Sequence, residues 1–171
     1  MIHASNTHFE RAEEVVLTRI FDAPRDLVFK VWTDPRYVAL WWGVNGATNV
    51  VHQMDVRPGG QWRIDMTVEN GTTYPNCGEF LEVIENERLS YTHVHQAESP
   101  AWKGAPPEPT TSTVEFEPHG PGTLVRMKVH FASEEDMQRM AATGLRRGLE
   151  QGFDRFAALL AKLTDPRKPG R

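Results

Sequence analysis

The stretch that decides the fold is residues 133–163, which read SEEDMQRMAATGLRRGLEQGFDRFAALLAKL. From Met137 to Leu163, apolar residues recur at intervals of three and four, the spacing that places side chains on one face of an α-helix. Ser133 opens the stretch, and the three acidic residues after it suit the positive end of a helix dipole. The pattern predicts a helix over 133–163, roughly 45 Å long. Its apolar face needs another element to cover it.

The residues before this helix alternate with a period of two, which is typical of half-buried β-strands. In WRIDMTV, residues 62–68, four apolar side chains alternate with three polar ones. Asn70-Gly71 then has the sequence of a tight hairpin turn. Four prolines between residues 96 and 109 predict a loop there, because proline cannot donate to a central ladder. Further strands are expected at about 77–84 and 88–95 and in a last hairpin around 119–122.

The N-terminal part predicts one strand followed by two short helices. VVLTRIF (15–21) favours a strand, RDLVFKVWT (25–33) has one apolar helical face, and YVALWWG (37–43) reads as a second helix stopped by glycine. Residues 1–13 are polar and aperiodic and predict a flexible arm. Residues 14–164 are expected to form a single domain, followed by a C-terminal tail over 165–171. The fold class is α+β: a curved antiparallel sheet covered by the long helix.

Composition excludes several classes of function. Hydrophobic residues make up 39% and charged residues 25% of the 171 residues, as in an ordinary globular protein. A net charge of −4 without clustered basic residues argues against nucleic acid as a partner. No apolar run approaches the ~18 residues of a membrane span, so no membrane partner is expected. The single cysteine, Cys77, cannot form an internal disulfide, which favours a reducing, cytoplasmic location and a buried structural thiol.

Several strings, in order, carry a family resemblance. They are LTRIFDAPRDLVFKVWTDP, LWWG, MDVRPGGQW, YPNCGEFLEVI, ERLSYTH, GTLVRMKV and GLEQGFDRFAALLA. Together, over about residues 15–163, they resemble the activator of heat-shock-protein-90 ATPase homologue-like family of the START-like (SRPBCC, helix-grip) superfamily. The resemblance implies a seven-stranded antiparallel sheet wrapped around the C-terminal helix, with two short helices after the first strand. It also implies a cavity between sheet and helix, which many relatives use for apolar ligands.

One departure from the family concerns this cavity. Where the family's terminal helix usually reads Gly-Trp-Glu, this chain has Gly148-Leu149-Glu150. Loss of an indole that faces the sheet is expected to enlarge or reshape the interior. Gly144, Gly148 and Gly152 recur every four residues, and each costs up to ~1 kcal/mol relative to alanine in a helix. Close approach of the sheet or space for a ligand would explain them, and a shallow kink is the alternative.

Aromatic and apolar residues with a few polar tips are what a small-molecule pocket needs. The alternative is that the same side chains simply fill the core. His93 is expected as a polar tip in the cavity, with His95 at the start of the loop. The candidate ligand-binding residues are Trp41, Trp42, Met54, Trp62, Ile64, Met66, Tyr74, Phe80, Tyr91, His93, Phe116, Met127, Leu145, Leu149 and Phe153.

Other chemistry finds less support. His93 and His95 share a strand face and could chelate a metal, but no ligand motif accompanies them, so no metal site is predicted. RPGG (57–60) lacks the Gly-Lys-Ser/Thr of a phosphate loop and reads as a hairpin turn, and no other cofactor motif occurs. No Gly-x-Ser-x-Gly nucleophile elbow is present, and no catalytic residue is assigned.

Three functions remain as hypotheses. The first is a non-catalytic protein that binds a hydrophobic, apolar or aromatic small molecule in the internal cavity. The second is an enzyme of cyclase, hydratase or hydrolase type that uses the same cavity, with His93 or Tyr91 as acid or base. The third is a co-chaperone-like module that docks a protein partner through its exposed sheet face or the 96–109 loop. The chain is expected to be a monomer or a homodimer.

Overall fold

The computed structural model describes residues 3–167, so the first two residues of the expected arm and the last four of the expected tail lie outside the described residues. Within that range, eight antiparallel strands form one sheet in the order β1-β2-β8-β7-β6-β5-β4-β3. The strands are β1 (Asn6–Arg11), β2 (Glu14–Phe21), β3 (Thr48–Met54), β4 (Gln61–Thr67), β5 (Thr73–Ile84), β6 (Arg88–His93), β7 (Thr110–His119) and β8 (Gly122–His130). The helices are α1 (Arg25–Thr33), α2 (Pro35–Trp41), α3 (Glu134–Ala142) and α4 (Leu145–Leu163).

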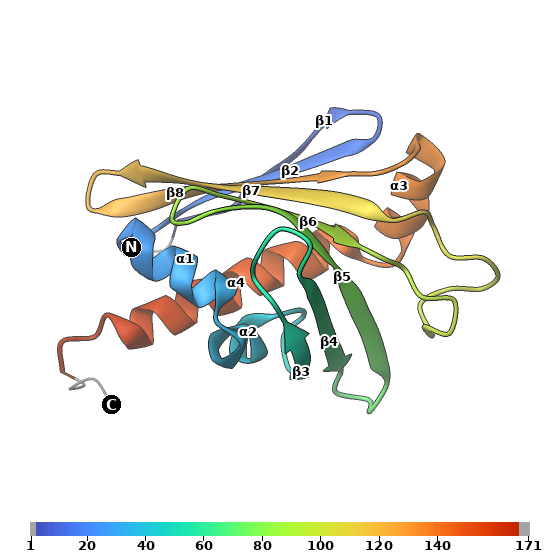
Figure 1. Cartoon of the computed structure of the whole chain (residues 1–171), viewed down its shortest axis with the longest axis horizontal. Helices are drawn as coiled ribbons and strands as arrows, with labels where there is room; N and C mark the ends of the chain where they lie inside the picture. The colour runs from blue at the N-terminus through green and yellow to red at the C-terminus, as the bar shows by residue number, and fades with distance from the viewer. Residues whose placement is uncertain (1–2, 168–171) are drawn as a thin grey trace.

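The sheet is strongly curved, and α4 lies in its concave side (Figure 1). β1, β2, β8 and β7 run above the helix, whereas β5, β4 and β3 turn down beside it. α1 and α2 follow β2 and close one end. Phe156 of α4 packs there against Phe21 and Trp41, with ring centroids 5.0 Å apart in both pairs. The expected α+β helix-grip architecture is thereby confirmed.

The strand count differs from the expected seven, because residues 6–11 form β1. The polar, aperiodic residues 1–13 predict a flexible arm, whereas Asn6 pairs with Thr18 and Arg11 with Glu14 of β2. β2 would otherwise present an open edge of unpaired backbone groups on this side. Backbone pairing can cover such an edge without any apolar alternation in the added strand, so the polar sequence gave no signal. Thr7 also donates a hydrogen bond of 3.0 Å to the Glu150 carboxylate of α4.

The expected helix over 133–163 is interrupted. Gly144 adopts a left-handed backbone (φ 89°) and separates α3 from α4. Met140 before the break and Leu145 after it both pack against the core, so the apolar spacing continues across a position that is not helical. The sequence periodicity therefore concealed the break. Its consequence is that α3 and the start of α4 meet at an angle beside the loop over residues 96–109 (Figure 1).

Arg155 of α4 joins the helix to the segment between α2 and β3. Its guanidinium donates hydrogen bonds to the carbonyl oxygens of that segment and of the end of α2. The acceptors are Leu40 at 3.0 Å, Trp42 at 2.7 Å, Val44 at 2.8 Å and Ala47 at 3.0 Å. Burial lowers the pKa of Arg155. A single side chain thus satisfies one carbonyl at the end of α2 and three carbonyls of the segment that separates α2 from β3.

We predict that Arg155→Met lowers the free energy of unfolding by about 2–4 kcal/mol, because several charge-assisted hydrogen bonds are lost at a partly buried site. Arg147→Met, at an exposed position of the same helix, is the matched control and should change it by less than about 0.5 kcal/mol. Urea denaturation measures both. Equal stability of the two variants would contradict the role given to Arg155.

Candidate functional site

A cavity of about 650 Å³ lies between the sheet and the start of α4. Its walls come from α3, the first half of α4, the 42–44 segment, the hairpin of β4 and β5, the loop after β6, and the inner faces of β6, β7 and β8. The break at Gly144 makes this space possible, because α3 and α4 border it from two directions. None of the described residues that line it is Asp, Glu, Lys or Arg.

Ten of the fifteen candidate residues are brought together around this cavity. They belong to the 41–42 pair, to β4–β6, to β8 and to α4, and their spacing in the sequence gives no hint of a common location. They are Trp41, Trp42, Met66, Tyr74, Tyr91, His93, Met127, Leu145, Leu149 and Phe153.

The other five candidates belong to the packed core. Met54, Trp62, Ile64 and Phe80 surround a separate void of about 20 Å³, room for about one water molecule. Phe116 packs edge-on against Phe29 and Trp32, with ring centroids 5.3 and 5.8 Å apart. All five face the inside, as strand alternation predicted, but at the end of the sheet that α1 and α2 fill. These five residues do not line the larger cavity.

Trp62 is fixed in that core by its indole. Its Nε1 donates to the Thr92 carbonyl oxygen at 3.1 Å. Gly78 of β5 makes this possible, because a Cβ atom there would collide with the same carbonyl and with the indole nitrogen. A side chain at residue 78 would therefore displace the Trp62 indole or the Thr92 carbonyl to which it is bonded.

The glycines of α4 have different roles. Gly144 breaks the helix, whereas Gly148 and Gly152 line the cavity. A Cβ atom at Gly148 would meet only the Val44 Cγ1 atom, at 3.9 Å, so no close packing requires glycine there. At Gly152 the nearest atom is the Gly43 carbonyl oxygen, at 3.7 Å, again an ordinary contact. Open space at the cavity wall, and not close approach of the sheet, therefore accounts for the glycines at positions 148 and 152.

Several lining residues had no signal of their own in the sequence. Thr110 and Ser112 continue the inner face of β7, but TTST is polar at every position and hides the alternation. Trp102 and Gln96 belong to the proline-rich loop, where neither period applies. Thr143 and Met140 line the cavity immediately before the helix break at Gly144.

Tyr91, His93 and His95 form a polar wall from alternate positions of one chain segment. The ring centroids of His93 and His95 lie 4.7 Å apart, and His95 lies 5.5 Å from Trp102. Burial lowers the pKa of His93 to about 3, and His95 adds to this effect. Burial also lowers the pKa of His95, against the opposing influence of Asp136.

Tyr91 is also held in its neutral form. Burial raises the pKa of its hydroxyl, and an interaction with Ser112 offsets only part of that increase. No hydrogen bond of standard geometry to a described residue reaches the Tyr91 hydroxyl or the His95 Nε2 atom. The wall is therefore uncharged near neutral pH.

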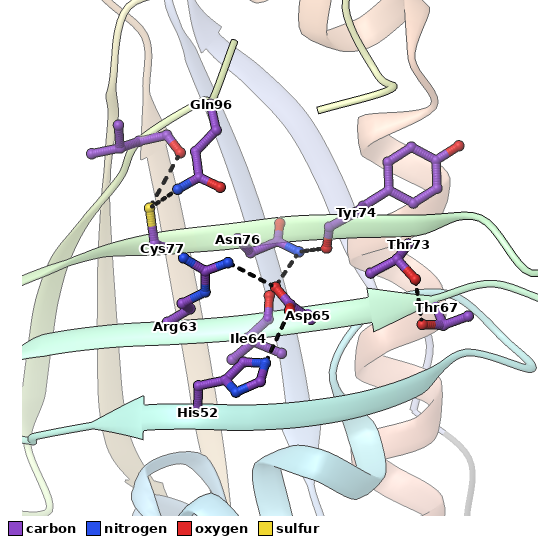
Figure 2. Close-up of polar contacts among 11 residues, drawn as sticks. His52, Arg63, Ile64, Asp65, Thr67, Thr73, Tyr74, Asn76, Cys77 and Gln96 are labelled. Carbon is purple, nitrogen blue, oxygen red and sulfur yellow. Dashed lines mark hydrogen bonds and ion pairs between the residues drawn. The ribbon is translucent and has the colours of Figure 1, made fainter. Parts of the chain in front are cut away.

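Gln96 completes this end of the cavity. Its Nε2 lies 3.2 Å from the Cys77 sulfur, to which it donates, while its buried Oε1 has no hydrogen-bond partner among the described residues (Figure 2). Burial raises the pKa of the Cys77 thiol. Cys77 is half-buried, not fully buried as predicted.

The neighbouring polar contacts belong to the outer face of the sheet. His52 Nε2 lies 2.9 Å from the Asp65 carboxylate, and Arg63 lies 3.7 Å from it (Figure 2). Asp65 alternates with Ile64 and Met66, which face inward, so this cluster is separated from the cavity by the sheet.

Within residues 3–167 there is no group of three or more His, Cys, Asp or Glu residues that could hold a metal ion. No described helix is long and apolar enough to cross a membrane.

A curved antiparallel sheet around a C-terminal helix, with an internal cavity beside that helix, defines a helix-grip protein. The family model described as "Activator of Hsp90 ATPase homolog 1-like protein" matches residues 22–161, and the chain belongs to this family. Comparison with curated proteins gives no match.

Solved structures share the fold. A protein from Arthrobacter aurescens is 23% identical with a TM-score of 0.83, over 96% of this chain and 98% of that one. A Mycobacterium smegmatis protein is 24% identical with a TM-score of 0.79, over 92% and 98% of the two chains. The AHSA1 protein of Silicibacter pomeroyi is 20% identical with a TM-score of 0.70, over 88% and 99%. At these identities the likeness concerns the fold alone.

The depressed pKa of His93 predicts a pH dependence of stability. An unfolded histidine binds a proton below about pH 6.5 and the folded one only near pH 3, so the unfolded state takes up more protons between these values and stability falls with falling pH. From about pH 7 to about pH 5 this effect amounts to about 2 kcal/mol.

Between pH 7 and pH 5, the free energy of unfolding of His93→Gln should fall by about 2 kcal/mol less than that of the unmodified protein. Urea denaturation at both pH values measures this difference. His119→Gln, on an exposed residue at the end of β7, is the control and should follow the unmodified protein. A His93→Gln variant with the same pH dependence as the control would show that His93 is not held neutral by burial.

Proposed function

We propose that this protein binds a small apolar or aromatic molecule in the cavity between the sheet and α4. The observation that carries the proposal is the cavity itself, about 650 Å³ with a mainly apolar and aromatic lining. Ligand pockets for compounds of drug size measure roughly 300–1,000 Å³ and combine apolar walls with a few polar groups. Trp42, Tyr74 and Trp102 supply flat aromatic walls, and Asn76, His93 and Thr110 are among the polar residues of the lining.

Membership of the family agrees with this proposal at the level of the fold. The absence of close packing around Gly148 supports it independently, because the helix leaves room where alanine would be the better helix former. The enzyme alternative draws less support from the same residues. A histidine whose pKa is held near 3 is a weak base at neutral pH, and a tyrosine whose pKa is raised is a weak acid.

The test is saturable binding of a neutral apolar dye, for which Nile red is suitable. We expect its fluorescence to rise on binding to the purified protein with a stoichiometry near one. A linear, non-saturating rise, equal to that given by an unrelated folded protein, would contradict the proposal.

We further predict that Leu149→Trp restores the indole usual in the family and occupies part of the cavity. Leu149 lines open space, so the larger side chain should leave the melting temperature unchanged or raise it, whereas an indole forced into a packed core costs about 1–3 kcal/mol. Nile red affinity should fall by at least about threefold. Leu163→Trp, on an exposed position of the same helix, is the matched control and should leave binding unchanged. Marked destabilisation of Leu149→Trp with undiminished dye binding would place the dye elsewhere.

A further inference from the structure

His93 presents hydrogen-bonding atoms to the cavity that the fold leaves unused. Its side chain lines the cavity and is half-buried, and its ring packs against the rings of Trp62 and His95, with centroids 5.4 and 4.7 Å away. No described residue forms a hydrogen bond with this ring, yet neither ring nitrogen is fully covered. Because residue 93 faces the inside of the sheet, a molecule in the cavity can contact these nitrogens.

Asn76 of the adjacent strand β5 offers a second accessible group. Its amide nitrogen donates to the carbonyl oxygens of Tyr74 at 2.9 Å and of Ile64 at 3.4 Å (Figure 2). Both partners are acceptors, so the amide must turn its nitrogen to them, and its Oδ1 remains free to accept. Asn76 lines the cavity and is half-buried. No described residue donates to its Oδ1, and that atom is not fully covered.

Strand register places these two residues near each other on one face of the sheet. Cys77 of β5 pairs with Val94, so Asn76 lies diagonal to His93. On its other side, His93 pairs directly with Thr110 of β7, another lining residue. Diagonal neighbours on a sheet face are about 7–8 Å apart, within the length of a two-ring molecule. One ligand can therefore contact His93 and Asn76 together.

The surroundings of His93 favour an uncharged ligand group. Burial lowers the pKa of His93 to about 3, so its imidazole is neutral at pH 7, with one nitrogen that donates and one that accepts. No described residue that lines the cavity is Asp, Glu, Lys or Arg, so an ionised ligand would enter without a counter-ion. Burying an unpaired charge is far less favourable than burying a neutral group that is hydrogen-bonded.

We propose that His93, with Asn76 beside it, is the subsite for an uncharged hydroxyl group of an otherwise aromatic or apolar ligand. A hydroxyl both donates and accepts, so it can donate to Asn76 Oδ1 or to one ring nitrogen of His93 and accept from the other nitrogen. This inference rests on the proposed function and adds the ligand's chemical class. A purely apolar ligand displaces water from these atoms without replacing its hydrogen bonds, and an ionised ligand binds least tightly.

Three probes of similar size test the proposal by equilibrium dialysis: 2-naphthol, 2-methylnaphthalene and 2-naphthoate, the last of which is an anion at neutral pH. The unmodified protein should bind 2-naphthoate at least about tenfold more weakly than 2-naphthol. His93→Leu removes both ring nitrogens. It should lower 2-naphthol affinity about three- to tenfold, the range expected for a neutral hydrogen bond, and leave 2-methylnaphthalene affinity within about twofold of its original value.

Two further variants and one measurement on the unmodified protein support this comparison. His93→Gln keeps a donor and an acceptor, so it should lose less 2-naphthol affinity than His93→Leu. His119→Leu makes the matched change at an exposed residue outside the cavity and should alter none of the affinities. In NMR spectra of the unmodified protein, the ring nitrogens of His93 should shift with 2-naphthol and much less with 2-methylnaphthalene.

Undiminished 2-naphthol affinity in a folded His93→Leu variant, or His93 ring nitrogens that respond equally to 2-naphthol and 2-methylnaphthalene, would overturn the subsite. The cavity proposal would stand in that case if Nile red still binds. Binding of 2-naphthoate as tight as that of 2-naphthol would overturn the restriction to uncharged groups. Failure of all three probes and of Nile red would refute the proposed function, and this inference with it.

Discussion

The structure depends on one constraint: a single helix must fill the concave side of a wide, curved sheet. α4 is too narrow to contact all of that surface, and its two halves pack against the sheet differently. The second half carries Phe156, which packs with Phe21, Trp32 and Trp41 into an aromatic core. The first half carries Gly148, where little side-chain volume faces the sheet. Core and cavity are therefore the filled and unfilled ends of one interface.

Polar groups are arranged so that the cavity side of this interface has no charged side chain among the described lining residues. Arg155 binds the carbonyl oxygens between residues 40 and 47 from the side of α4, and thereby holds the segment that gives Trp42 and Val44 to the cavity wall. The ion pair of His52 and Asp65 lies on the opposite face of the sheet. Tyr91, His93 and His95 on the cavity wall are neutral, since burial disfavours the charged forms of the histidines and the tyrosine. The same packing that stabilises the fold leaves the cavity wall without a charged side chain among the described residues.

Strand alternation predicted correctly which side chains face inward, but not how far along the sheet they lie. Trp62 and Tyr91 both satisfy the period of two, yet Trp62 borders only the small void in the core and Tyr91 reaches the cavity. Periodicity predicts the face of the sheet on which a side chain lies. Whether that side chain lies in the core or at the cavity depends on which helix covers its part of the strand. Gln96 and Trp102 lay outside any periodic segment, so the sequence offered no reason to place them at the site.

By itself the sequence determined the α+β class and the inward faces of the strands, because apolar spacing and turn residues act locally, and its resemblance to a known family indicated the helix-grip architecture. Tertiary structure alone decided the eighth strand, since residues 6–11 pair through their backbone and need no apolar pattern. It also decided the break at Gly144, which the continuous apolar spacing concealed. The neutral state of His93 arises in the same way. Whether a buried group finds a hydrogen-bond partner depends on chain segments that only folding brings together.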